Sequence, residues 1–74
     1  MGQLRNKALL KKIGRRVKEV RLENKITQQK FYFDTEIHIA RIETGEQNIS
    51  VSTLDAICKY FKIALTTFFE NIEK

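Results

Sequence analysis

Polar side chains with hydrogen-bonding chemistry gather in the middle of the chain. The set combines amides, a guanidinium, a hydroxyl group, an imidazole and a carboxylate: Gln28, Gln29, Glu36, His38, Arg41, Thr44 and Asn48. The side chains in this set with N–H or O–H donors can bond to phosphate oxygens, and arginine can also bind the edge of a guanine base through two hydrogen bonds. No other part of the sequence offers competing chemistry, so binding of a nucleic acid is the first hypothesis.

The elements that must position these side chains are two short helices joined by a tight turn. Thr27 has the side chain and position of an N-cap for a helix that carries residues 28–33. Asp34 and Thr35 are typical of turns and N-caps, so the second helix is predicted over about Glu36 to Thr44.

Gly45 follows, and glycine tolerates the left-handed conformation that ends many helices. The segment of about residues 27–45 therefore has the form of a helix-turn-helix motif, whose second helix usually lies in a DNA major groove.

Three further helices are predicted around this motif. From Leu4 to Asn24 the apolar residues recur every three or four positions and form one face: Leu10, Ile13, Val17 and Val20. Ser50 is a second N-cap candidate, followed at helical spacing by Val51, Leu54, Ile57, Cys58 and Phe61. A last helix over residues 66–72 carries Phe68, Phe69 and Ile72. The expected fold is all-α and compact, with five helices.

Composition supports this expectation. The 74 residues are enough for a single domain, over 1–74, with a modest core. There is no proline and there are only 3 glycines, which favours helices over a turn-rich β fold. Cys58 is the only cysteine, so an intrachain disulfide is impossible and a zinc site is implausible. We therefore expect neither a metal nor another cofactor, and a reducing, cytoplasmic location.

The basic residues are concentrated at one end of the chain. The formal net charge is +5. Within the first third, only Glu19 and Glu23 oppose a long series of cations: Arg5, Lys7, Lys11, Lys12, Arg15, Arg16, Lys18, Arg21 and Lys25. Such a field suits a polyanion, although a solvated charged face would explain it equally. No apolar run approaches the roughly 20 residues of a membrane span, and the N-terminus does not resemble a signal peptide.

The order of these motifs resembles the Cro and phage-repressor family of helix-turn-helix proteins, also called XRE-like. The resemblance covers about residues 13–69, and its carriers are IGRRVKEVR, TQQ at 27–29, RIETG at 41–45 and SVSTLDAICKYFKI from 50. Family members usually have a small-residue turn, often Gly-Val-Ser, between the second and third helices. Here about three residues are missing, which implies a shorter second helix or a changed angle between the helices.

The resemblance also implies particular roles. It places Gln28, with Gln29 beside it, on the DNA backbone at the start of the second helix, where free N–H groups suit a phosphate. It pairs Arg21 with Glu43 in a buried ion pair that would fix the third helix rather than add much stability.

Within the third helix, Arg41 is the leading candidate for reading a guanine. Ile37 could contact a thymine methyl group or pack in the core, and Glu36 could accept from a cytosine amino group. His38 could donate to phosphate when protonated, or be solvated or structural. In the loop that follows, Thr44 and Asn48 are candidates for phosphate contacts.

The leading hypothesis is a sequence-specific DNA-binding transcriptional regulator that acts as a homodimer on a pseudo-palindromic site in double-stranded DNA. Phe68, Phe69 and Ile72 form a candidate dimer surface, unless two of them complete the core of the single chain. The alternative is an antitoxin-like or other protein-interaction module on the same fold. Membrane or RNA binding through the basic helix is disfavoured, as is enzymatic activity, because the residue patterns that these functions need are missing.

Overall fold

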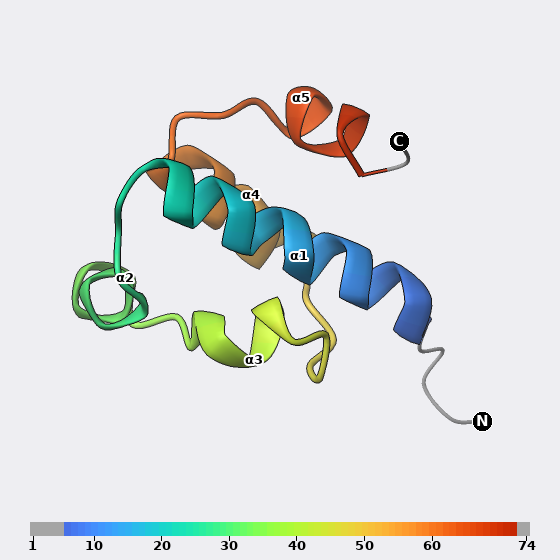
Figure 1. The fold of residues 1–74 in the computed structure, drawn as a ribbon, viewed down its shortest axis with the longest axis horizontal. Helices are drawn as coiled ribbons and strands as arrows, with labels where there is room; N and C mark the ends of the chain where they lie inside the picture. The colour runs from blue at the N-terminus through green and yellow to red at the C-terminus, as the bar shows by residue number, and fades with distance from the viewer. Residues whose placement is uncertain (1–5, 73–74) are drawn as a thin grey trace.

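Residues 6–72 are described by a computed structural model of the chain, and they form five helices joined by short loops (Figure 1). The helices are α1 (Lys7–Glu23), α2 (Gln28–Thr35), α3 (Ile39–Glu43), α4 (Val51–Tyr60) and α5 (Leu65–Glu70). No strand occurs within this range, so the all-α prediction is confirmed. The first residues of the long N-terminal helix, predicted from Leu4, lie outside the described residues.

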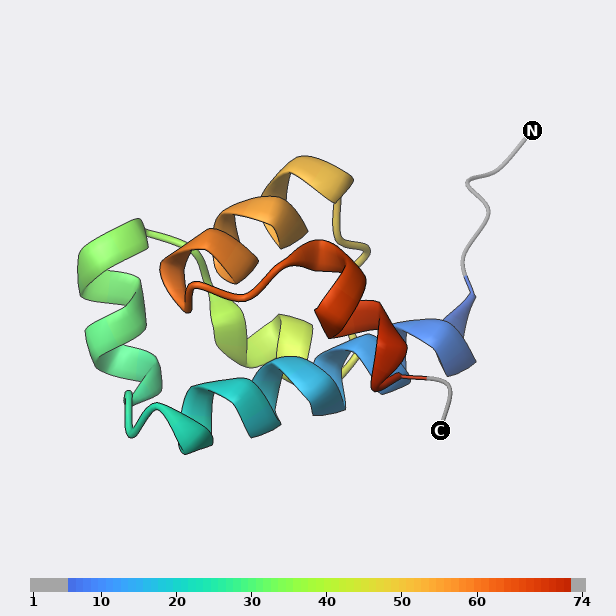
Figure 2. The ribbon, with the colours of Figure 1, turned by 90° about the horizontal axis from the view of Figure 1, so that it is seen from above.

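The long helix α1 runs through the molecule, and the other helices surround it (Figure 1). It packs along α3 on one side, while α4 packs against α5. Seen from above, α2 closes the end of the molecule where α1 finishes, and α3 lies beyond it between α1 and α4 (Figure 2). Of the two helices of the motif, α3 is therefore held against α1 as well as against α2.

Side-chain caps begin three of the helices. The hydroxyl of Thr27 accepts from the backbone N–H of Lys30 at 3.0 Å, and that of Ser50 accepts from Thr53 at 3.0 Å. Both N-caps were predicted from the sequence, and both are confirmed. Asn6 caps α1 in the same way. Each cap satisfies a backbone donor that the helix itself cannot, a contribution of about 1 kcal/mol.

The core is built from apolar side chains of all five helices. Phe31 of α2 lies at its centre, fully buried, with its ring stacked at 5.5 Å from Phe61 and edge-on at 4.8 Å to Tyr60. The remaining buried members are Ile13, Val17, Val20, Ile39, Ile42, Leu54, Ile57, Cys58, Phe68 and Ile72. Most of the apolar faces predicted for the helices are present, but Val51 is an exposed exception.

The boundary between α2 and α3 differs from the prediction. The second helix continues through Asp34 and Thr35, and Glu36 closes it in the left-handed conformation at φ 61°. The hydroxyl of Thr35 donates to the Phe31 carbonyl one turn back at 2.8 Å and accepts from the Ile37 N–H at 3.1 Å, so Thr35 stabilises the end of α2 and does not begin α3. The third helix starts only at Ile39.

The two helices of the motif differ in length. The α2 helix keeps 8 residues, whereas α3 has only 5. The sequence left open a shorter second helix or a changed angle between the helices; in the structure residues 36–38, which were expected to begin the third helix, lie between α2 and α3.

A hydrogen bond joins α2 to α4 across the aromatic core. The Tyr60 hydroxyl donates to Asp34 Oδ2 at 2.5 Å, and Lys30 Nζ lies 3.2 Å from the other carboxylate oxygen. The Tyr60 bond, and then Lys30, hold the pKa of Asp34 below its ordinary value of 3.8. In turn, the carboxylate raises the pKa of Tyr60 above its ordinary value of 10.0.

We expect the Tyr60→Phe variant to melt a few degrees below the wild type, and only within a defined pH range. The contribution of a carboxyl with a lowered pKa is present above its ordinary pKa and lost as pH falls through the folded value. The contribution of a tyrosine with a raised pKa is lost as pH rises past its ordinary value toward the folded one. The difference in Tm should therefore be largest near neutral pH and shrink below pH 3.8 and above pH 10.0.

Tyr32→Phe is the matched control, since the Tyr32 hydroxyl has no hydrogen bond within the described residues. A pH-independent difference would contradict this account.

Candidate nucleic-acid interface

The third helix is short but firmly anchored. Ile39 and Ile42 are buried, so α3 is fixed against the core from both of its turns. Arg41 lies between them on the opposite side, exposed, and its guanidinium makes no hydrogen bond or ion pair with the described residues. The result is an unengaged guanidinium on a rigid support, as required for bidentate binding of a guanine or phosphate.

The residues just before α3 have three different environments. Glu36 belongs to the end of α2, so its predicted place in the recognition helix is wrong. Ile37 is half-buried against the core, which favours packing over a contact with a thymine methyl group. His38 is exposed at the N-cap position of α3, and its side chain makes no capping hydrogen bond. Its ring lies against that of Tyr32, with centroids 4.7 Å apart and a tilt of 32°.

His38, Arg41 and Gln47 line one hollow on this surface. These residues come from the start of α3, its middle, and the loop beyond it. Three side chains with N–H donors therefore converge on a space that the protein leaves open. Arg41 and His38 were singled out from the sequence, but Gln47 was not, because nothing local in the sequence shows that the loop folds back toward α3.

The ion pair predicted between Arg21 and Glu43 is present. Arg21 Nε lies 2.6 Å from Glu43 Oε2 and Arg21 Nη2 lies 3.2 Å from Oε1, and the two side chains are only 8% and 3% exposed. A third guanidinium hydrogen bond goes to the Ile26 carbonyl at 2.8 Å. The pair thus joins the end of α1, the α1–α2 turn and the last residue of α3.

The two glutamines at the start of α2 differ in their surroundings. The side-chain amide of Gln28 donates to Glu43 Oε1 at 3.0 Å, so this nitrogen is engaged inside the protein. Gln28 itself is exposed, and the first backbone N–H groups of an α-helix have no partner within the helix. Gln29 is exposed. The start of α2 can still receive a phosphate, because backbone N–H groups and the helix dipole act without the Gln28 amide nitrogen.

The loop after α3 lies beside the N-terminal part of α1. Gly45 adopts φ +78°, as predicted, and a side chain there would meet Lys11 Cγ at 2.9 Å. Lys7 and Lys11 line a hollow together with Thr44, Gly45 and Glu46. The Thr44 hydroxyl lies 2.9 Å from Glu46 Oε1 and 3.1 Å from the Arg41 carbonyl.

These neighbours single out two lysines from the basic run. The sequence alone could not select Lys7 and Lys11, because their proximity to Thr44 depends on how the loop returns to α1. Asn48, farther along this loop, is exposed.

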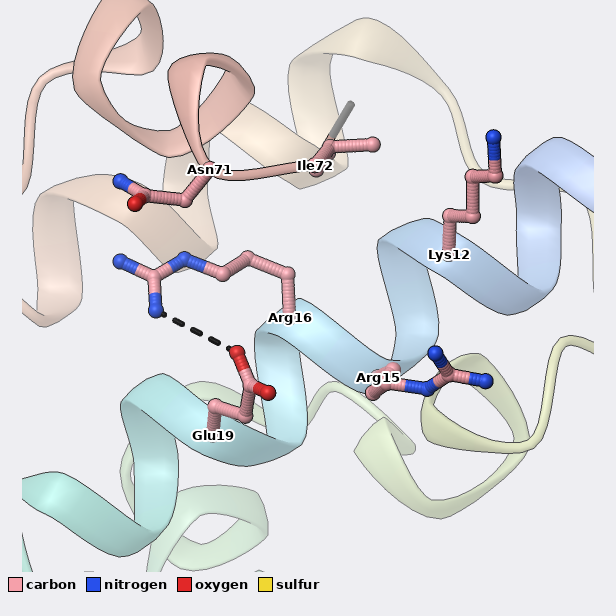
Figure 3. Close-up of a pocket in the computed structure, with 6 residues that line it drawn as sticks. All are labelled: Lys12, Arg15, Arg16, Glu19, Asn71 and Ile72. Atoms are coloured by element: carbon pink, nitrogen blue, oxygen red, sulfur yellow. Dashed lines mark hydrogen bonds and ion pairs between the residues drawn. The ribbon is translucent and has the colours of Figure 1, made fainter. Parts of the chain in front are cut away.

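Three other cations of α1 lie at a second hollow. Lys12, Arg15 and Arg16 line a hollow beneath the end of α5, together with Glu19, Asn71 and Ile72 (Figure 3). The Arg16 guanidinium points toward Glu19, with Nη1 3.4 Å from Oε1 (Figure 3). Cations of α1 therefore line two separate hollows, one next to the α3–α4 loop and one next to the end of α5.

The three residues predicted to form a dimer surface do not lie together on the outside. Phe68 and Ile72 are buried in the core of the single chain, and only Phe69 is substantially exposed, at 43%. Helix α5 must cover the core next to α4, and it uses these two side chains to do so. The alternative that two of the three complete the core is correct.

Cys58 is a free, buried cysteine, and burial raises the pKa of its thiol, so it is a poor nucleophile. Within residues 6–72 no three His, Cys, Asp or Glu side chains are grouped so that they could hold a metal ion. None of the helices in that range has the length and apolar character needed to cross a membrane.

Comparisons with known proteins agree with this architecture. The helix-turn-helix family model named HTH_3 matches residues 17–68. The chain therefore belongs to the XRE-type helix-turn-helix family. No curated protein matches.

Among solved structures, the chain is similar to the restriction-modification controller protein C.Esp1396I, as a tetramer in complex with its natural 35-base-pair operator. The identity is 28% and the TM-score 0.77, over 86% of this chain and 88% of that one. A tyrosine-to-phenylalanine mutant of the same controller matches with 26% identity and a TM-score of 0.80, over 93% and 90% of the two chains.

Proposed function

We propose that this protein is a sequence-specific DNA-binding transcriptional regulator, formed by a single helix-turn-helix domain. The observation that carries this proposal is the exposed, unengaged Arg41 on an α3 helix that buries Ile39 and Ile42 and is tied to α1 through Glu43. A rigid helix that presents an arginine is suited to reading a guanine in the major groove. The similar controller protein C.Esp1396I binds its operator as a tetramer.

We expect phosphate contacts on both sides of this base contact, one set from the start of α2 and one from the loop after α3. The start of α2 offers Gln28 and Gln29, and the loop after α3 offers Thr44 and Asn48. To these we add Lys7 and Lys11, which lie next to Thr44 and Gly45. Contacts of this kind position the protein on the duplex but carry no sequence information.

The proposed complex contains two protomers on a pseudo-palindromic site, since a dimer doubles the number of bases read and matches the symmetry of an operator. Phe69 on α5 is the candidate apolar contact between protomers, since it alone of the three predicted residues is exposed. Such a protein acts on DNA in the cytoplasm and catalyses no reaction.

The test is selection of binding sites from a random DNA library, followed by titration of the best site at several salt concentrations. We expect a symmetric motif. Arg41→Ala should relax the preference at one guanine in each half-site, at a cost of about 1–3 kcal/mol. Lys11→Gln should instead weaken binding to all sequences and reduce the slope of log K against log salt by about one per protomer. If both variants merely weakened binding uniformly, Arg41 would not be a base reader.

A second candidate function is a protein-interaction module, and the observation in its favour is an apolar surface on α2. Phe33 is 82% exposed and Tyr32 is partly exposed beside it. A surface aromatic of this size is frequent where one protein binds another. A stable complex with a protein partner, together with no enriched DNA motif, would favour this function over the first.

A further inference from the structure

The geometry points to His38 as a second base-reading residue next to Arg41, held in place by the ring of Tyr32. This inference rests on the proposed function and extends it to the pattern of bases that the protein selects. It replaces the expectation from the sequence that His38 contacts phosphate.

Position is the first reason. The residues at the N-terminal end of a recognition helix are those that usually contact base edges. Here α3 begins at Ile39, so His38 occupies that end. Of the residues between α2 and α3, Glu36 closes α2 and Ile37 packs against the core. Glu36 is exposed but its carboxylate offers no donor to a guanine, whereas His38 is exposed, carries ring N–H donors and makes no capping hydrogen bond with its side chain.

Orientation is the second reason. An exposed histidine samples several rotamers, and fixing one of them costs conformational entropy at the moment of binding. The Tyr32 ring, 4.7 Å from that of His38, limits this freedom before DNA arrives. Tyr32 comes from α2, which is anchored by the fully buried Phe31 next to it in sequence. Tyr32 is therefore a positioning residue, and its ring rather than its hydroxyl performs the role.

The spacing of His38 and Arg41 indicates which bases the two residues contact. His38 and Arg41 line the same hollow and are three residues apart, the interval at which residues of a zinc-finger helix contact successive bases. An imidazole N–H and a guanidinium are both donors, and guanine presents two acceptors, N7 and O6, in the major groove. We therefore infer that each half-site contains two adjacent guanines, one read by Arg41 and the other by His38.

The experiment is the library selection repeated at fixed salt with variants of these two residues. His38→Ala should leave the rest of the motif intact and reduce the guanine preference at the base pair next to the Arg41 position by about fivefold, the lower end of the range for a base-specific contact. His38→Asn should shift the preference there from guanine to adenine, because an amide pairs with adenine N6 and N7.

Tyr32 provides a matched pair of variants. Tyr32→Ala removes the ring and should weaken the preference at the His38 base pair alone, whereas Tyr32→Phe keeps the ring and should select the wild-type motif. Thermal melting of each variant shows whether the fold is retained, and both positions are exposed enough for the fold to tolerate substitution.

The outcomes separate the two proposals. If the wild type selects a motif that His38→Ala and His38→Asn leave unchanged at every position, His38 does not read a base, and the inference is overturned while the proposed function stands. If the wild type selects no motif, the proposed function fails and this inference fails with it. An equal effect of Tyr32→Ala and Tyr32→Phe would refute the positioning role of the ring.

Discussion

Replacing Glu43 with alanine is expected to lower the free energy of unfolding by about 3–5 kcal/mol, the range for breaking a buried ion pair by removing one partner. The loss is large because Arg21 remains, only 7% exposed, with a charge that no carboxylate neutralises. Gln28 would also lose its acceptor. Since small domains unfold at a net cost of about 5–15 kcal/mol, this single change would remove much of the stability. Urea denaturation followed by circular dichroism measures it.

The control removes both charges together. In the double variant Arg21→Met, Glu43→Leu no charge is stranded, and replacement of a buried ion pair by apolar groups of similar volume is often neutral or stabilising. The double variant should thus be markedly more stable than Glu43→Ala. If Glu43→Ala unfolds at the wild-type urea concentration, the pair has no structural role in solution.

The comparison of Thr27 with Glu36 explains which features of the fold could be predicted from the sequence. Thr27 and Ser50 are capping residues whose side chains bond three residues ahead, so the signal is local and the prediction of both helix starts was correct. The end of α2 gives no such signal. Its left-handed residue is Glu36, and the left-handed residues at positions 25 and 62 are lysines. Among residues 6–72, only Gly45 combines this conformation with the residue type that predicts it.

The prediction that Asp34 and Thr35 lie in a turn before the third helix was wrong for a related reason. Both are frequent N-cap residues, but here their side chains bond elsewhere: Asp34 reaches Tyr60 on α4, 26 positions along the chain, and Thr35 bonds back to Phe31. A contact of such separation is decided by the packing of α2 against α4, and no local pattern contains it. The same holds for Gln47 and Lys11, whose places in the candidate interface depend on the path of a loop.

For α5, the sequence predicts which residues are apolar but not which way they face. The helix carries the three large apolar residues noted from the sequence, but their number does not distinguish a face that covers the core from a face that binds a partner. Phe68 and Ile72 are buried and Phe69 is exposed, because only one face of α5 packs against the core. By contrast, Arg21 and Glu43 were paired correctly, because the resemblance to a family supplied a contact between distant residues that spacing alone does not.

Gly14→Ala is the second substitution from which we expect a large effect, and it acts where α1 meets α3. A methyl group at position 14 would overlap the Ile42 carbonyl oxygen and lie 2.6 Å from that of Glu43, both backbone atoms. Neither can rotate away as a side chain could, so α3 must move off α1. Alanine gains about 1 kcal/mol of helix propensity over glycine, but overpacking of this kind costs about 3 kcal/mol, the upper end of its usual range.

The net loss should therefore be about 2 kcal/mol, measured by urea denaturation. Lys18→Ala is the control, because it changes an exposed position of the same helix and should stay within about 0.5 kcal/mol of the wild type. The displacement of α3 also predicts a loss of DNA sequence preference under conditions where the variant is still folded, since Arg41 and His38 move with the helix. A Gly14→Ala variant more stable than the wild type would mean that α1 and α3 are not in close contact in solution.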